Sequence, residues 1–258
     1  MEKDIVEIAR IVEGLRWHAL EDDEVVGRGD ALRRPDGRVF LGIDAWRDEV
    51  FGLLAATMLS DLPGTVYTLV DEDDQEARAR WRGAGFVVCR QERVYRVPTD
   101  PEITGLGRVP APPGVTILPM GQAEEEPLRE LDRVVRAEVD ATVGWQSMPA
   151  EMRTRPDGTL GVIDPSAYVV AVQDGEYIGQ TRVAVLPRRS RLGLVAVRTA
   201  HRRRGLARAM LAEMLGSLHR SGITSVSAEV DDLNKAAITL FESIGAQRVG
   251  GAMEMLHL

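Results

Sequence analysis

The chain has 258 residues, of which 44% are hydrophobic and 28% are charged, and its formal net charge is −8. This length accommodates two domains, and the composition is ordinary for a globular protein. The acidic balance argues against nucleic acids or anionic membranes as general partners, because binding to either needs a basic face. No apolar run approaches the roughly 18 residues that a membrane-spanning helix requires.

The single cysteine, Cys89, rules out an intramolecular disulfide. The N-terminus lacks a basic segment followed by an apolar one, so no signal peptide is expected. Both features fit a cytoplasmic protein. Cys89 adjoins the apolar run Phe86 to Val88, which predicts a small buried residue. The four histidines show no metal-ligand spacing, so no metal site is predicted.

The first half of the chain has a mixed helix and strand pattern. Val39 to Ile43 and Val66 to Asp71 are typical of strands. Between them, the segment Ala45 to Phe51 contains no glycine and carries Asp48 and Glu49. A phosphate would meet repulsion and poor backbone access there, so this half is not expected to bind a phosphate-bearing ligand.

A proline-rich stretch divides the chain. Residues 98–115 contain five prolines and three glycines, and no helix or strand period runs through them. This composition indicates an extended linker. The predicted organisation is therefore a first domain at 1–98, a linker at 99–115 and a second domain at 116–258.

The second domain begins with a helix and a strand pair. Pro127 to Val139 has an apolar face at helical spacing. Tyr168 to Val172 and Tyr177 to Val185 read as strands joined by Asp174-Gly175, and this dipeptide between apolar runs is a strong hairpin signal. Of the arginines that follow, Arg188, Arg189 and Arg191 are assigned to a solvated loop.

The basic turn Arg202 to Ala207 is the most informative segment. It follows the predicted strand Leu192 to Val197 and precedes an apolar stripe of helical spacing from Leu206 to Leu218. Gly205 would let a ligand approach the backbone, while the helix end presents N–H groups and positive potential to an anion. An ordinary turn followed by a solvated, arginine-rich helix start would show the same spacing.

A second motif strengthens the anion-binding interpretation, because the two together resemble the GCN5-related N-acetyltransferase (GNAT) superfamily over roughly residues 116–258. The phosphate loop of that family reads Arg/Gln-x-x-Gly-x-Gly/Ala. Its second signature reads Asn-x-x-Ala-x-x-Leu-Tyr-x-x-x-Gly-Phe. Phe241 replaces the usual tyrosine and Ala246 the usual phenylalanine. The matching residues are Arg202, Gly205, Ala207, Asn234, Ala237, Leu240 and Gly245.

The first half contains a weaker copy of the second motif at an offset of 160 positions. Chance similarity between short patterns is the alternative. If the two halves arose by duplication, the resemblance implies an α/β (α+β) fold of two GNAT-like domains. Each domain would be a mixed, mostly antiparallel sheet flanked by helices, and the first domain would be degenerate. The corresponding residues are Asp74, Ala77, Trp81, Gly85 and Phe86, against Asn234, Ala237, Phe241, Gly245 and Ala246.

The resemblance implies an acetyl-CoA-dependent N-acetyltransferase that acts on a small-molecule or peptide amine, and a homodimer is compatible with it. Backbone amides of the basic turn would hold the pyrophosphate, and the preceding strand would pair with the pantetheine arm. The Val197 N–H would polarise the thioester carbonyl. The expected cofactor-binding residues are Val195, Ala196, Val197, Arg202, Arg203, Arg204, Gly205, Leu206, Ala207, Arg208, Asn234, Ala237 and Phe241.

Glu229 and Asn234 are the catalytic residues that the resemblance implies. Glu229 lies five residues before Asn234, where some members of the family place a general base, and Asp231 is the second choice. Phe241 has no hydroxyl to protonate the departing thiolate. An acyl-CoA-binding protein with little turnover is therefore the competing hypothesis. Trp145 and Met148 are expected either to line the acceptor pocket or to belong to local core.

Overall fold

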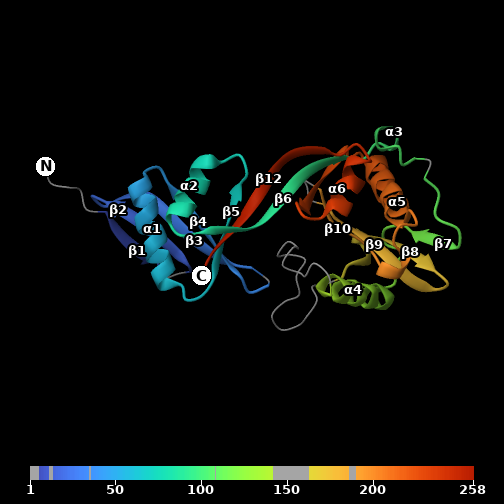
Figure 1. Cartoon of the computed structure of the whole chain (residues 1–258), viewed down its shortest axis with the longest axis horizontal. Coiled ribbons are helices and arrows are strands. Elements are labelled where there is room, and N and C mark those ends of the chain that lie inside the picture. Colours follow the sequence, from blue (N-terminus) through green and yellow to red (C-terminus); the bar gives the residue numbers. More distant parts are fainter. Residues whose placement is uncertain (1–5, 12–13, 35, 108, 142–162, 186–189) are drawn as a thin grey trace. The chain divides into compact units, whose positions relative to one another are not determined.

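The computed structural model describes residues 6–11, 14–34, 36–107, 109–141, 163–185 and 190–258 (Figure 1). The chain divides into two units. Among the described residues, unit 1 comprises 6–91 and 251–258, and unit 2 comprises 92–250. No helix in the described part of the chain is both long and apolar enough to cross a membrane.

Unit 1 is a mostly antiparallel sheet with two helices packed on one face. Its strand order is β1-β2-β3-β4-β5-β12-β6, and β4 and β5 are the parallel neighbours. Trp17, Leu54 and Met58 are fully buried between the sheet and α1. The elements are β1 (Glu7–Ile11), β2 (Arg16–Glu21), β3 (Glu24–Arg33), β4 (Val39–Ala45), α1 (Asp48–Asp61), β5 (Val66–Asp71), α2 (Gln75–Gly83), β6 (Val87–Pro98) and β12 (Gln247–His257).

Unit 2 is a mixed sheet with helices on both faces. Its strand order is β6-β11-β10-β9-β8-β7. α5 and α6 share the larger apolar core with one face, and α4 packs in a second core on the other. The elements are α3 (Pro101–Thr104), β7 (Val115–Leu118), α4 (Glu125–Asp140), η3 (Pro165–Ala167), β8 (Tyr168–Gln173), β9 (Glu176–Ala184), β10 (Arg191–Val197), η4 (Thr199–His201), α5 (Leu206–Arg220), β11 (Ser225–Asp231) and α6 (Lys235–Glu242).

Each unit is completed by a strand from the other half of the sequence. The end of β12, residues 252–257, pairs with β5 in unit 1. The end of β6, residues 92–98, pairs along the whole of β11 in unit 2. The strands β6 and β12, labelled in Figure 1, each contribute residues to both units. The two sequence halves have therefore exchanged their last strands.

Both halves repeat one local layout. The parallel strands β4 and β5 pair only at 39–66 and 40–67, and β10 and β11 pair only at 191–227 and 192–228. The helix after the second strand is capped in the same way each time. Asp74 Oδ1 accepts the Ala77 N–H at 2.8 Å, and Asn234 Oδ1 accepts the Ala237 N–H at 3.1 Å. These caps lie 160 positions apart, which supports the internal duplication.

The turn between β8 and β9 and the environment of Cys89 differ in how well they match the sequence predictions. The Asp174-Gly175 hairpin is confirmed, since both residues have positive φ angles of 52° and 81°. The prediction that Cys89 is buried is wrong, because Cys89 is exposed. Side chains alternate along β6, so Val88 packs against the core of unit 1 while Cys89 faces the other way. Its Sγ donates to the Glu254 carbonyl at 3.3 Å, and partial desolvation of the thiol together with the nearby Glu254 carboxylate raises the thiol pKa.

Candidate functional site

The predicted phosphate loop, Arg202–Ala207, leads directly into α5 and is called the phosphate loop below. Gly205 is the N-cap residue, with φ at 84° and no side-chain cap bond. A Cβ built on Gly205 would meet nothing within 4 Å. The first intrahelical bond is donated by Ala209 N–H to the Gly205 carbonyl at 3.1 Å. The N–H groups of residues 206–208 precede that bond, so they point out of the positive helix end, where an anion binds favourably.

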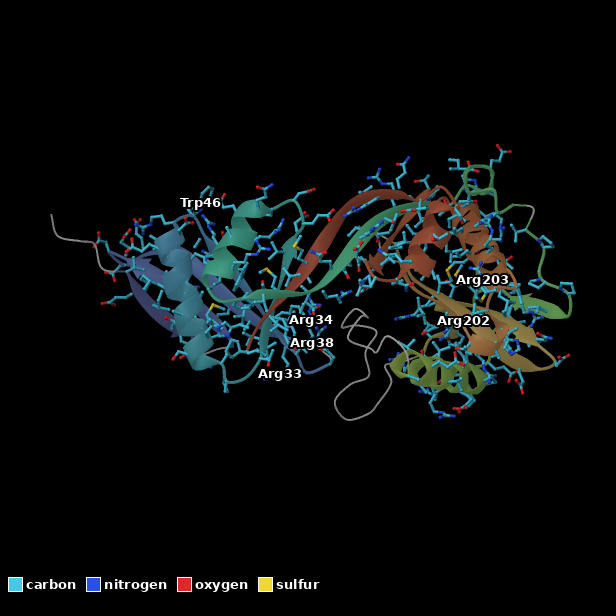
Figure 2. All side chains as sticks on the ribbon, in the orientation of Figure 1. Arg33, Arg34, Arg38, Trp46, Arg202 and Arg203 are labelled. Carbon is cyan, nitrogen blue, oxygen red and sulfur yellow. The ribbon has the colours of Figure 1, made fainter. Side chains whose placement is uncertain are left out.

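The arginines around this loop differ in their hydrogen-bond partners. Arg202 Nε donates to the Val197 carbonyl at 3.1 Å, Arg204 Nη1 to Gln173 Oε1 at 2.9 Å and Arg208 Nη1 to Ser243 Oγ at 2.9 Å. Arg203 has a positive φ of 64° and an exposed side chain, for which no ion pair occurs within the described part of the chain. Figure 2 shows Arg202 and Arg203 beside β10 and α5. Arg203 is thus the arginine best placed to turn toward a phosphate.

Beyond residues 192 and 228, β10 and β11 no longer pair within the described chain, and we call this stretch the β10–β11 opening. A β-bulge at residues 192–194 marks its start on the β9 side. Arg198 N–H donates back to the Ile178 carbonyl of β9 at 2.9 Å. Because backbone groups alternate along a strand, the N–H groups of Val195 and Val197 face away from β9 toward the opening.

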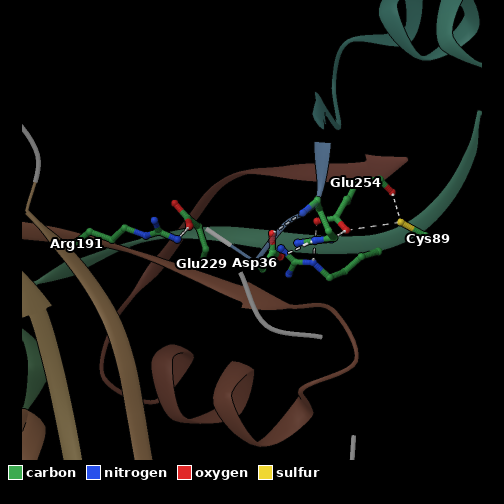
Figure 3. Close-up of polar contacts among 7 residues, drawn as sticks. Asp36, Cys89, Arg191, Glu229 and Glu254 are labelled. Carbon is green, nitrogen blue, oxygen red and sulfur yellow. Dashed lines mark hydrogen bonds and ion pairs between the residues drawn. The ribbon is translucent and has the colours of Figure 1, made fainter. Parts of the chain in front are cut away.

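Glu229 is the first β11 residue past the paired region. Ala228 and Val230 point into the core beneath α5, so the Glu229 side chain lies on the opposite face of the sheet. Its carboxylate forms an ion pair with Arg191, whose guanidinium is drawn beside it in Figure 3. The assignment of Arg191 to a solvated loop is therefore wrong. Arg191 opens β10, and its side chain is only 29% exposed.

Asn234 and Phe241 occupy structural positions on α6. Asn234 caps the helix through Ala237, and Phe241 is 5% exposed and stacks on Tyr95 with ring centroids 6.1 Å apart. Asp231 Oδ1 accepts the Leu233 N–H at 2.8 Å, which fixes the turn before the helix. Alternation along β11 puts Glu229 and Asp231 on the sheet face opposite α5, and Asp231 differs from Glu229 because its carboxylate is bound in the turn before α6.

The helix predicted over Pro127 to Val139 is confirmed as α4, whereas Tyr95 and the polar cluster at Asp132 were not predicted from the sequence. Tyr95 is buried in β6, where it donates to Glu242 Oε1 at 2.9 Å, and burial raises its pKa. On the opposite face, Asp132 of α4 pairs with Arg136 at 2.5 Å and accepts from Gln180 Nε2 at 3.4 Å. Buried polar residues within an apolar helical stripe are the sequence signal for such a cluster. Trp145 and Met148 lie outside the described residues.

Residues 134–246 match a family model described as the acetyltransferase (GNAT) family. The match spans the strand β10, the phosphate loop, Glu229 and α6. Within the C-terminal half of the chain, residues 134–246 are thus similar to the GNAT domain. The name of the matched family gives acetyl transfer as its chemistry. Among curated proteins, none matches the sequence closely enough to name a relative.

Solved GNAT structures share the fold over nearly the whole chain. A GCN5-related N-acetyltransferase from Sphaerobacter thermophilus is 19% identical, with a TM-score of 0.66 over 94% of this chain and 80% of that one. A tandem GNAT protein from the clavulanic acid biosynthesis pathway is 18% identical, with a TM-score of 0.62 over 94% and 82%. A Kribbella flavida protein is 14% identical, with a TM-score of 0.60 over 96% and 88%. At these identities the likeness concerns the fold.

In unit 1 the equivalents of the GNAT site are altered. The 160-position offset places Leu69 where Glu229 stands, and the strand register places Phe40 where Arg191 stands. At the start of α1, Arg80 donates to Asp48 Oδ1 at 2.7 Å and to the carbonyls of residues 45 and 46 at 3.2 Å. The side chains of Arg80 and Asp48 therefore occupy the position in unit 1 that corresponds to the phosphate loop. The start of α1 also has free N–H groups before its first intrahelical bond, but the Asp48 carboxylate beside them repels a phosphate.

We expect one coenzyme A per chain for this reason. An isothermal titration of the full chain with acetyl-CoA should give a stoichiometry of one. Replacing Arg80 with alanine should leave that number unchanged, because Asp48 and the unpaired carbonyl oxygens remain. A stoichiometry of two, or loss of the single site in Arg80→Ala, would contradict the assignment of the site to unit 2.

Proposed function

We propose that the GNAT domain transfers the acetyl group of acetyl-CoA directly to a primary amine of a small molecule or peptide. The observation that carries this proposal is the continuity of the β10–β11 opening with the phosphate loop. Strand N–H groups face the opening at Val195 and Val197, and the strand then runs through η4 into the positive end of α5. Acetyl-CoA has an extended arm that ends in a pyrophosphate, so one strand and one helix end suit its two parts.

The residues present fit such a ligand. Gly205 leaves space above the backbone for a phosphate, and Arg203 adds an exposed cation close by. When bound, acetyl-CoA supplies an activated acetyl thioester. The Val197 N–H is oriented to donate to a carbonyl oxygen at the opening, which stabilises the negative charge that develops there during acyl transfer.

Glu229 is proposed to accept the proton from the amine, either directly or through water. Its carboxylate lies on the sheet face opposite α5 and beside the first unpaired positions of the opening. Without an acceptor, the Glu229 carboxylate forms an ion pair with Arg191, so the ammonium group of an incoming acceptor would compete with Arg191 for the carboxylate oxygens. Acidic charge at this point fits a cationic acceptor.

A dedicated acid is not required for the reaction. Phe241 is buried and lacks a hydroxyl, and the Tyr95 hydroxyl is bound to Glu242. A free thiol has a pKa of about 8.5, so its thiolate is a tolerable leaving group at neutral pH. Loss of one proton donor reduces rates by about 10²–10⁴-fold, which slows catalysis without ending it.

The substitution Glu229→Gln tests the base. We expect kcat/KM to fall by roughly 10²-fold or more, with acetyl-CoA affinity near that of the unmodified chain, and the acidic limb of the pH–rate profile should disappear. Glu213→Gln is the matched control, since Glu213 pairs with Arg220 on the outer side of α5. Unchanged kcat/KM in Glu229→Gln would remove Glu229 as the base.

An acyl-CoA-binding protein with little turnover is the second candidate function. Two observations favour it, namely the buried Phe241 in place of a tyrosine and the engagement of Glu229 by Arg191. The two candidates differ in one measurable property. A binding protein would take up acetyl-CoA and release no thiol with any amine.

A further inference from the structure

Glu138, near the end of α4, reaches the start of the phosphate loop. Its Oε2 accepts two hydrogen bonds from Thr199, from the backbone N–H at 2.8 Å and from Oγ1 at 2.8 Å. The same oxygen lies 3.7 Å from Arg202 Nη2. The side chain of Glu138 is 24% exposed, so these contacts are partly shielded from water. One carboxylate oxygen thus binds two residues of the segment between β10 and α5.

These contacts fix the entry to the loop. Thr199 begins the short helix η4, and its preceding residue, Arg198, supplies no side-chain cap bond. Glu138 provides an acceptor for this helix start from a distant element. Arg202 follows η4, and its Nε donates a hydrogen bond to the Val197 carbonyl. The path from Val197 to the loop is therefore clamped at two points, one of which is Glu138.

A negative charge this close to an anion site should weaken anion binding by repulsion. Two effects therefore oppose each other. The first is the order that Glu138 imposes on the loop through charge-assisted hydrogen bonds, which are stronger than neutral ones. The second is Coulombic repulsion, which is reduced here because Arg202 neutralises the carboxylate and solvent screens partly exposed charges.

We infer that the first effect dominates and that Glu138 is a positioning residue for the phosphate loop, which it holds in the form that binds the pyrophosphate of coenzyme A. This inference rests on the proposed cofactor and is independent of the acceptor and of Glu229. Glu138 itself makes no contact with the ligand in this account. It acts through Thr199 and Arg202.

The test measures the dissociation constant of coenzyme A by calorimetry for the full chain and its variants. We expect Glu138→Ala to weaken binding by about tenfold, equivalent to about 1.4 kcal/mol. Glu138→Gln should recover most of the affinity, because the amide oxygen can still accept from Thr199. Thr199→Val, which removes only Oγ1, should weaken binding by less. Glu130→Gln is the control, since Glu130 pairs with Arg133 on the same helix and should leave binding unchanged.

Kinetics separate positioning from a general loss of structure. In Glu138→Ala the KM for acetyl-CoA should rise by a similar factor while kcat at saturation stays within about twofold of the unmodified value. Equal or tighter binding by Glu138→Ala would show that repulsion dominates and would overturn the inference. If Glu138→Ala is too unstable to measure, the other two variants still test the inference. Unchanged coenzyme A affinity in Thr199→Val together with tighter binding by Glu138→Gln would overturn the inference. An unmodified chain that fails to bind coenzyme A would instead remove the proposed function.

Discussion

Replacing Gly205 with aspartate is expected to abolish acetyl-CoA binding and to leave the chain folded. The added carboxylate would stand at the mouth of the α5 N-terminus, where the pyrophosphate carries like charge. The positive φ of Gly205 strains any side chain, but a Cβ there meets open space and aspartate tolerates positive φ better than most residues. The chain should therefore stay folded with a modestly lower melting temperature, while acetyl-CoA binding is lost.

Gly205→Ala separates charge from backbone strain. Alanine at a φ of 84° costs about 1–2 kcal/mol, so its melting temperature should fall below that of Gly205→Asp while it still binds acetyl-CoA. Calorimetry gives the affinities, and circular dichroism during heating gives the melting temperatures. Equal acetyl-CoA affinity in the unmodified chain and in Gly205→Asp would contradict the assignment of the phosphate loop.

Residues 116–258 produced alone are expected not to form a stable unit. That segment lacks the end of β6, which pairs along all of β11, whereas β10 supports β11 only at residues 191–192. Tyr95 and Val97 of β6 are fully buried in the core of unit 2. Removing two such side chains forfeits about 1.5–3 kcal/mol each, and it also exposes the edge of the strand that carries Glu229. These losses compare with a typical total stability of about 5–15 kcal/mol.

Residues 87–258 form the matched comparison, because they retain β6. We expect this longer piece to unfold cooperatively and to bind acetyl-CoA, with the unpaired tail 251–258 frayed. Thermal unfolding followed by circular dichroism and amide exchange of β11 would distinguish the two pieces. Cooperative unfolding and full acetyl-CoA affinity in residues 116–258 would show that the exchanged strand is dispensable.

The local features of the site could be predicted from sequence because each depends on neighbours along the chain. The hairpin at Asp174-Gly175 and the glycine at the start of α5 follow from the φ angles that such turns require. The cap at Asn234 follows from its hydrogen bond three residues ahead. The family resemblance rested on the same short segments, and the match at residues 134–246 covers them.

Features that depend on pairing between distant segments could not be predicted. Alternation of side chains predicts a strand but says nothing of its partner, so the exchange of β6 and β12 left no sequence signal. The ion pair of Arg191 with Glu229 arises only because β10 and β11 adjoin, and their residues are 38 positions apart. Cys89 was placed on the wrong face because a continuous apolar run does not reveal which side chains point inward.

The central claim is that unit 2 transfers the acetyl group of acetyl-CoA to an amine. The most direct measurement follows thiol release from acetyl-CoA by the full chain with a panel of primary amines, namely aminoglycosides, polyamines and basic peptides, and identifies acetylated products by mass spectrometry. The account predicts amine-dependent thiol release with an equal amount of acetylated amine, and none of either with Gly205→Asp. Binding of acetyl-CoA without thiol release for every amine would contradict it and favour the binding-protein function.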